Sequence, residues 1–407
     1  MQPVVQNTGG ETRRPLQVGW LVWGDESGGV ATAVLNNAQV LKQLGQEVVL
    51  WCLGPGMLAD AATQRGWQVH GLGQSAELHQ AYIRYGFSVM GGLRRIRVLL
   101  GLRKTLQNGL GKAPPDVLCL PWPDLMPLAG PVARHLGIGL VLEMPNTPSH
   151  YPFQLNQRLY AWATRRWRVQ IFANSEFSAS RLALVPKVAV VTPAVDAERF
   201  DPAQVVPVPR KLLGLPENAI VLGLIARLDP SKGADLLLSA LAALRNEVDD
   251  LHLLLVGGPL ASDYGLALRT QVKTAGLEQR VHWVDTVPDP ERYWGACDLA
   301  INARHDVEPF GLSIIEAMLM ARPVLAHSLG QPGTTIEDGR TGWLYHRPDV
   351  AALVEALRRA LDARKQWPAM GHLARAEALR RFASDAASRH YLHLLQAQTD
   401  QARKLAA

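Results

Sequence analysis

An apolar segment that reads as a buried strand, followed by a loop and then a helix, occurs once in each half of this chain. In the first half, residues 17–23 lead through the glycine-rich loop 24–30 into a helical pattern over 31–44. In the second half, residues 219–225 lead through a charged loop into a helical pattern over 233–245. Strands that alternate with helices predict parallel sheets covered by helices. The sequence therefore predicts an α/β protein with two doubly wound domains.

Length and composition agree with two domains that fold in water. The chain has 407 residues, and 48% of them are hydrophobic, which is enough apolar material for two cores. No apolar run reaches the roughly 18 residues that a membrane-spanning helix needs. Residues 1–15 lack the apolar centre of a signal peptide. Cys52, Cys119 and Cys297 are far apart without metal spacing, so we expect reduced thiols in a cytoplasmic protein.

Three prolines between residues 201 and 209 mark the predicted linker between the domains. Pro202, Pro207 and Pro209 stiffen the chain and interrupt regular structure. We therefore place the first domain at residues 1–196 and the second domain at residues 210–384.

The stretch 304–322 carries two carboxylates, Glu308 and Glu316, with seven residues between them. Pro309 disfavours helix at the residue before it, so Glu308 is predicted in a loop. A helix is predicted over residues 313–320, with Glu316 in its first turn and free N–H groups at its start. Together the two carboxylates suit the hydroxyl groups of one ligand. The alternatives are a capping box formed by Ser313 and Glu316, and a solvated loop acid at Glu308.

Two further loops suit an anionic ligand. Arg227 and Lys232 lie close to the start of the helix at 233–245, and two cations beside a helix N-terminus suit a diphosphate. Gly28 and Gly29 lie where the first strand gives way to a helix, which is the usual ligand crevice of such sheets. The alternatives are a solvated loop in the first case and a plain turn in the second.

Glu308-x7-Glu316, with Pro309-Phe310-Gly311 inside it, resembles the signature of the retaining GT-B glycosyltransferases of family four, the glycosyl transferases group 1. The resemblance implies two Rossmann-like domains that face each other across a cleft, and a C-terminal helix at about 385–407 that returns to the first domain. It implies that Glu308 contacts the donor sugar and that Glu316 holds the ribose. The backbone of Phe310, Gly311 and Leu312 would contact sugar and phosphate.

The resemblance extends to the other loops. Arg227-x4-Lys232-Gly matches the diphosphate-binding loop of the family, which gives both cations a catalytic role. Gly28 and Gly29 would approach the phosphates and the sugar from the first domain. The family binds its nucleotide base near the strand-end loop that here spans residues 285–288 and contains Val287. We count Val287 with the donor site, together with Gly257 at the end of the strand predicted over 251–256.

The chain departs from the family pattern at two places. Many of these enzymes carry a His at the end of the strand that corresponds to residues 139–142, whereas this chain continues with Glu143. Asn146 is our first candidate for the acceptor side, with Glu143 and His150 as alternatives. Gln331 and Thr334 stand where the family has a glycine and a glutamate near the phosphates, which puts donor preference or activity in question.

The net charge of +6 is uneven along the chain. Residues 1–200 carry 19 Lys or Arg against 12 Asp or Glu, whereas the rest carries 23 against 24. A basic first half indicates an anionic partner: a membrane surface, an anionic acceptor or a nucleic acid. Nucleic acid is disfavoured because no recognition module is present.

Basic residues alternate with apolar ones between residues 82 and 112, where no acidic residue occurs. Such a segment suits peripheral contact with an anionic membrane on the cytoplasmic side. The alternative is a surface helix with one face on the sheet. Gly91 and Gly92 argue against one long helix. A second basic cluster, residues 165–168 with Trp167, follows a helix predicted over 152–164 and suits either role.

These features and the resemblance together predict a metal-independent transfer of a hexose from a nucleotide diphosphate sugar to a hydroxyl of a glycan, lipid or small molecule. The resemblance implies that the transfer is retaining. The chain has no Asp-x-Asp metal motif, and no cofactor is expected. One alternative is a non-catalytic protein of this fold that binds nucleotide sugars. A dinucleotide oxidoreductase is another, although no Gly-x-Gly-x-x-Gly follows the first strand. A glucan phosphorylase shares the architecture, but no lysine-anchored pyridoxal site is evident.

Overall fold

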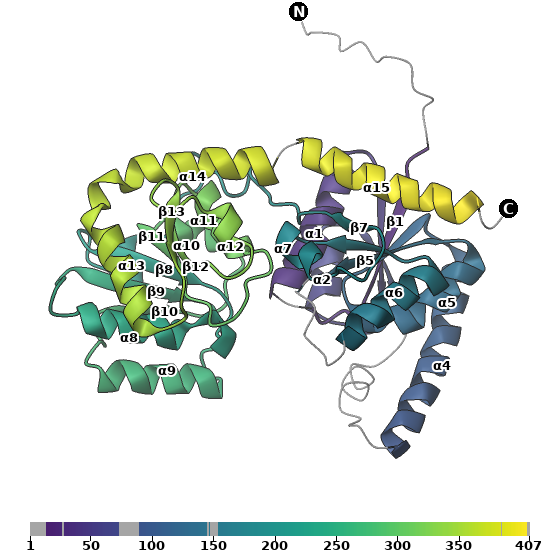
Figure 1. Ribbon diagram of the computed structural model, residues 1–407, viewed down its shortest axis with the longest axis horizontal. Coiled ribbons are helices and arrows are strands. Elements are labelled where there is room, and N and C mark those ends of the chain that lie inside the picture. Colours follow the sequence, from purple (N-terminus) through teal and green to yellow (C-terminus); the bar gives the residue numbers. More distant parts are fainter. Residues whose placement is uncertain are drawn as a thin grey trace, which may run out of the picture.

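Two parallel sheets, each covered by helices, form the computed structural model of this protein (Figure 1). The structure describes residues 14–26, 28–72, 89–144, 146, 154–383 and 385–404, without the side chains of 89–99 and 385–386. The first sheet has the strand order β3-β2-β1-β4-β5-β6-β7 and the second has β10-β9-β8-β11-β12-β13. Strand order reverses beside β1 and beside β8, which is the doubly wound arrangement. The predicted fold class is confirmed.

The first sheet is buried on both faces because its strands are apolar at nearly every position. Val18, Trp20 and Val22 of β1 belong to the apolar cluster on one face of the sheet. Leu21, and Trp23 just after the strand, belong to the cluster on the other face. All neighbouring strands are parallel. The strands are β1 (Gln17–Val22), β2 (Glu47–Cys52), β3 (Gln68–Gly71), β4 (Val117–Leu120), β5 (Gly139–Met144), β6 (Gln170–Ala173) and β7 (Val188–Val190).

Helices cover both faces of the first sheet. One face carries α1 (Gly28–Gln43), α2 (Met57–Gln64) and α15 (Asp385–Lys404). The other face carries α4 (Val89–Lys112), α5 (Met126–Leu136) and α6 (Leu155–Trp167), and α7 (Glu176–Ser180) follows β6.

Two of these helices differ from the prediction. α1 begins at Gly28, so Gly28 and Gly29 form its first turn and are not part of the loop. α4 continues through Gly91 and Gly92, so the predicted break is wrong. A helix tolerates glycines at a modest cost when tertiary contacts hold it. Such contacts exist here: Leu102, Leu106 and Leu110 of α4 are buried in the core.

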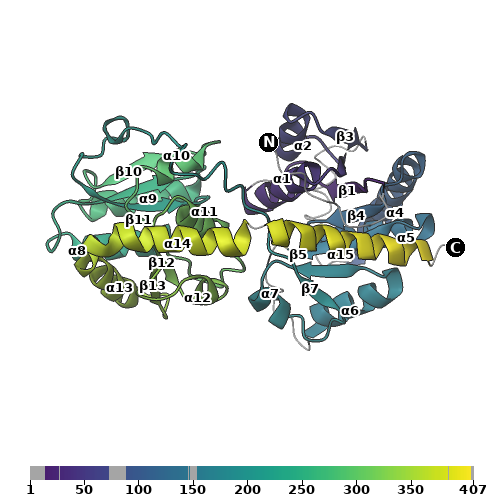
Figure 2. The same cartoon turned by 90° about the horizontal axis from the view of Figure 1, so that it is seen from above.

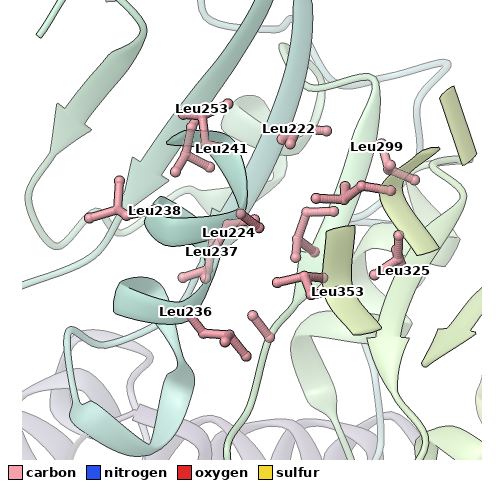
Figure 3. Close-up of a cluster of buried hydrophobic side chains, with 14 of the residues drawn as sticks. Leu222, Leu224, Leu236, Leu237, Leu238, Leu241, Leu253, Leu299, Leu325 and Leu353 are labelled. Carbon is pink, nitrogen blue, oxygen red and sulfur yellow. The ribbon is translucent and has the colours of Figure 1, made fainter. Parts of the chain in front are cut away.

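The second sheet follows the same plan. Its strands are β8 (Ile220–Ile225), β9 (Leu251–Val256), β10 (Val281–Val284), β11 (Leu299–Asn302), β12 (Val324–His327) and β13 (Gly342–Tyr345). Leucines of the strands meet those of α8 (Ala234–Leu244) and α13 (Val350–Asp362) in a dense cluster, which also takes in α9 (Asp263–Thr274) (Figure 3). The opposite face carries α10 (Pro290–Trp294), α11 (Leu312–Leu319) and α14 (Trp367–Phe382).

The chain crosses between the domains twice. Residues 191–199 leave β7 for the second domain, whereas the predicted linker at 201–209 already packs there, since Val208 N donates to Arg292 O at 3.1 Å. α14 then runs into α15, and the two helices lie end to end across both domains (Figure 2). Gln398 of α15 donates to the backbone oxygen of Leu140 in β5 at 3.0 Å. The C-terminal helix therefore packs on the first sheet. None of the described helices combines the length and apolarity that crossing a membrane requires.

Candidate active site

A cavity of about 1200 Å³ lies at the carboxyl ends of the strands and is lined by both domains. Every predicted site residue in the described part of the chain lines it. His150, the alternative acceptor-side residue, lies outside the described residues. The predicted residues that meet here are Gly28, Gly29, Asn146, Arg227, Lys232, Gly257, Val287, Glu308, Phe310, Gly311, Leu312 and Glu316.

Glu308 is buried and held by three donors, with only 7% of the residue exposed. Its Oε2 lies 3.4 Å from Asn302 Nδ2, 3.5 Å from a guanidinium nitrogen of Arg304 and 3.6 Å from Lys232 Nζ. The backbone of Glu308 also pairs with the loop after β12, through Leu329 and Gln331. The solvated-acid interpretation of Glu308 is therefore wrong, because this carboxylate is fixed among two cations and an amide.

Glu316 lies in the second turn of α11 and not in its first. The helix begins after Gly311, whose φ of +87° places it in the left-handed region, and no side chain caps the helix. The capping-box interpretation of Ser313 and Glu316 is therefore wrong. Burial raises the pKa of Glu316 to about 7, while Arg199 and the indole of Trp294 act in the opposite direction.

Arg227 and Lys232 flank a short turn after β8. Asp229 accepts hydrogen bonds from the backbone N–H and the hydroxyl of Ser231 at 2.9 and 2.6 Å, which fixes the turn. Lys232 ends this turn immediately before Gly233 and α8. Burial lowers the pKa of Lys232, and the nearby Glu308 carboxylate opposes that shift. Both cations face the same cavity.

The start of α1 lies close to the second domain. A Cβ atom on Gly28 would lie 3.0 Å from Arg227 Nε, and one on Gly29 would lie 3.7 Å from a methyl group of Leu312. Gly257 has a φ of +140°, and a Cβ there would lie 1.8 Å from the carbonyl oxygen of Ala226. Glycine is therefore required at Gly257, where the backbone turns tightly at the cavity wall.

Asn146 and Glu143, two of the candidates for the acceptor side, both line the cavity, but Glu143 is engaged by other side chains. Glu143 accepts from Trp20 Nε1 at 2.9 Å, from Asn37 Nδ2 at 3.3 Å and from the hydroxyl of Tyr391. Burial raises its pKa. This carboxyl group therefore joins β5 to α1 and α15.

Several cavity residues of the first domain belong to no sequence motif and were not predicted. Except for Arg181, which ends α7, they come shortly after β1, β4 or β6, where the rule that ligands bind at the carboxyl edge of a parallel sheet would have found them. They are Trp23, Asp25, Glu26, Trp122, Asp124, Asn174 and Arg181.

Gln331 and Thr334, which differ from the family pattern, do not line the cavity. Gln331 is buried, and its backbone N–H donates to Glu308 O at 2.9 Å. The Thr334 side chain is exposed, and its backbone oxygen accepts from Arg381 at 2.8 Å. The loop 328–336 therefore holds the backbone of Glu308 in place, although none of its described residues lines the cavity.

Two family models match this chain, one on each domain. The model for Glycosyltransferase Family 4 matches residues 27–199, and the model for Glycosyl transferases group 1 matches residues 219–363. The D-inositol 3-phosphate glycosyltransferases of Streptomyces avermitilis and Streptomyces coelicolor are 36% and 34% identical over 186 and 210 residues. These matches cover 43% and 46% of this chain and 39% and 45% of the relatives, so the chain spans less than half of their length.

Solved structures share the whole architecture. A glycosyltransferase from Rickettsia africae has a TM-score of 0.79 at 18% identity, covering 95% of this chain and 99% of that one. Anabaena HepE in complex with UDP and glucose has a TM-score of 0.76 at 21% identity, covering 94% and 99%. These similarities establish the GT-B fold, and the two family models account for both domains. The chain belongs to glycosyltransferase family four, the glycosyl transferases group 1.

Proposed function

We propose that this protein is a retaining hexosyltransferase that uses a nucleotide diphosphate sugar and a hydroxyl acceptor on a glycan, a lipid or a small molecule. One observation carries the proposal: Glu308, Glu316, Arg227 and Lys232 converge on a single cavity between the domains. Two cations beside tight loops suit a diphosphate, and two carboxylates suit the hydroxyl groups of a sugar and a ribose.

The comparisons support the donor class. HepE, which shares the fold, was solved with UDP-glucose, and the curated relatives are named as glycosyltransferases. UDP is therefore the first nucleotide to test. Val287 packs against the apolar cluster around Phe310, at the end of the cavity where we place the base.

In the proposed reaction, the bond between the anomeric carbon and the diphosphate oxygen breaks while the acceptor oxygen bonds to the same carbon. Arg227 and Lys232 stabilise the charge that develops on the leaving diphosphate. Glu308, fixed 3.6 Å from Lys232, orients the sugar. The acceptor attacks on the face from which the diphosphate departs, and a departing phosphate oxygen takes the acceptor proton. The product then keeps the anomeric configuration of the donor.

We also propose that transfer needs neither a metal ion nor a cofactor, because the two cations supply positive charge at the phosphates. Transfer rates should then be equal with and without EDTA. Cytoplasmic location and peripheral membrane contact through residues 82–112 stay predictions. Within the described side chains of that segment, Lys104 and Lys112 are exposed, whereas Leu102 and Leu106 are buried.

Thermal unfolding with UDP, GDP, ADP and their sugar conjugates, in EDTA, tests the donor site. A ligand that binds only the folded state raises the melting temperature. We expect one nucleotide class to stabilise the wild type and Lys273→Ala, an exposed cation of α9, but not Arg227→Ala/Lys232→Ala. Equal stabilisation of all three proteins would overturn the assignment of the diphosphate site. An inverted product anomer in an NMR assay would overturn the retaining mechanism.

A further inference from the structure

The exposed face of α6 is formed by three large apolar side chains and three arginines. Leu155 and Leu159 are each 55% exposed and Trp162 is 50% exposed, although core residues of this size are normally buried. Their spacing of four and three residues places them in one stripe along the helix. Ala161 and Ala163, on either side of Trp162 in the sequence, are buried on the first domain.

Arginines border this stripe, and acids are absent from it. Arg158, Arg165 and Arg166 are exposed, and α6 contains no Asp or Glu. Among the ion pairs of the described residues, none involves these three guanidinium groups. The face therefore combines an apolar surface with a local positive charge.

We infer that this face of α6 is a docking surface for an anionic lipid bilayer. A helix with leucines and tryptophan on one stripe and arginines beside it suits the boundary between acyl chains and anionic head groups. Each basic residue near such a surface adds attraction. A second copy of the chain fits less well, because a symmetric interface through this stripe would bring the arginines of both copies together.

The described side chains of the segment that the sequence indicated pack largely on the protein, so we place the docking surface on α6. Leu102, Leu106 and Leu110 of α4 are buried in the core, so this part of residues 82–112 packs on the protein. In contrast, the leucines of α6 face outward, on the side of the first sheet remote from α15 (Figure 1).

The position of α6 connects the bilayer to the proposed reaction. A helix that follows a parallel strand starts at the carboxyl edge of the sheet, and α6 follows β5. Met144 and Asn146, at that same edge, line the cavity. Leu155 therefore lies at the end of the stripe nearest the cavity. This placement favours an acceptor carried by a membrane lipid, and this part of the inference rests on the proposed function.

Co-sedimentation with vesicles tests the docking surface without any substrate. The probes are vesicles of phosphatidylcholine with phosphatidylglycerol, and vesicles of phosphatidylcholine alone. We expect the wild type to bind the anionic vesicles and Leu159→Ser/Trp162→Ser to bind them roughly tenfold less, because two half-exposed apolar side chains are lost. The matched control is Leu266→Ser on α9 of the other domain, where the leucine is 54% exposed. It should bind like the wild type.

Three outcomes would overturn the inference. The wild type could fail to bind anionic vesicles, or Leu159→Ser/Trp162→Ser could bind them as well as the wild type does. Light scattering could instead reveal a dimer that this variant dissociates, which would make the face an interface between copies. Nucleotide-dependent stabilisation, measured on the same proteins, separates this test from the proposed function. Arg227→Ala/Lys232→Ala should lose that stabilisation and keep vesicle binding.

Discussion

The hydroxyl of Ser175 donates a hydrogen bond of 2.6 Å to the carbonyl oxygen of Pro309. Ser175 belongs to the first domain and caps α7, whereas Pro309 directly follows Glu308 in the second domain. The residue Ser175 is 1% exposed, so the bond is shielded from water. This contact links the first domain to the loop that carries the proposed catalytic carboxylate.

Replacing Ser175 by Ala should weaken domain closure over the donor. The cap of α7 is lost at a cost of about 1 kcal/mol, and the Pro309 carbonyl loses its donor. We expect kcat/KM for the donor to fall roughly tenfold in steady-state assays. Ser262→Ala is the matched control, because Ser262 also caps a helix and donates to a proline carbonyl, Pro259, at 2.7 Å within one domain. Equal kcat/KM values for the two variants would contradict a role in closure.

Replacing Glu308 by Gln should separate transfer from nucleotide binding. The carboxylate lies within 3.6 Å of both Lys232 and Arg304. Its loss removes the ion-pair partner of Lys232, whereas Arg304 keeps its ion pair with Asp306. We expect transfer to fall about 100-fold because the sugar is no longer oriented. UDP affinity, measured by calorimetry, should hold or rise because the phosphates meet less compensated cations. A variant with normal transfer rates would remove Glu308 from the mechanism.

Stability should depend on pH through Glu316. Its pKa in the folded protein is raised from 4.5 to about 7, so between these values the folded carboxyl keeps a proton that the unfolded one releases. The unfolding free energy contributed by this group is therefore highest below 4.5 and falls as pH rises toward 7. In denaturant titrations, the unfolding free energy of Glu316→Gln should fall less between pH 4.5 and about 7 than that of the wild type. Glu355→Gln, an exposed acid of α13, should keep the wild-type slope.

Nucleotide affinity should change with pH in the opposite direction. If Glu316 accepts hydrogen bonds from ribose hydroxyls, its ionised form binds better. We expect the affinity for UDP to rise roughly tenfold between about pH 6 and pH 8, and to stay flat in Glu316→Gln. Parallel pH profiles in calorimetry would exclude this contact.

An alanine at Gly28 should impair donor binding by displacing Arg227. The new methyl group would lie 3.0 Å from Arg227 Nε, and Gly28 has a positive φ of +63°. Gly45→Ala provides the control, because Gly45 has a φ of +77° with nothing within 4 Å of the added atom. Both variants should lose about 1 kcal/mol of stability from backbone strain, but only Gly28→Ala should lose UDP affinity. Equal UDP affinity in both variants would argue against the contact.

Much of the fold and of the candidate site followed from local sequence. Continuous apolar runs such as β1 and β8 can be buried on both faces of a parallel sheet, and the helices between them fix the doubly wound order. Because the carboxyl ends of parallel strands share one edge, Arg227, Lys232 and Glu308 were predictable neighbours. Trp122, just after β4, follows the same rule and was missed only because no motif marks it.

Tertiary structure decided what local patterns leave open. Ser313 and Glu316 have the spacing of a capping box, yet packing starts α11 at Gly311 and turns Glu316 toward the cavity. α4 and α6 both combine basic and apolar residues, and no periodicity says which apolar stripe meets the core. The sequence by itself determined the parallel strands, most of the helices between them and the charged groups of the site, because these depend on neighbours along the chain. Only the packing of helices on the sheet decided that Leu106 is buried and Leu159 is exposed, because burial depends on contacts between distant segments.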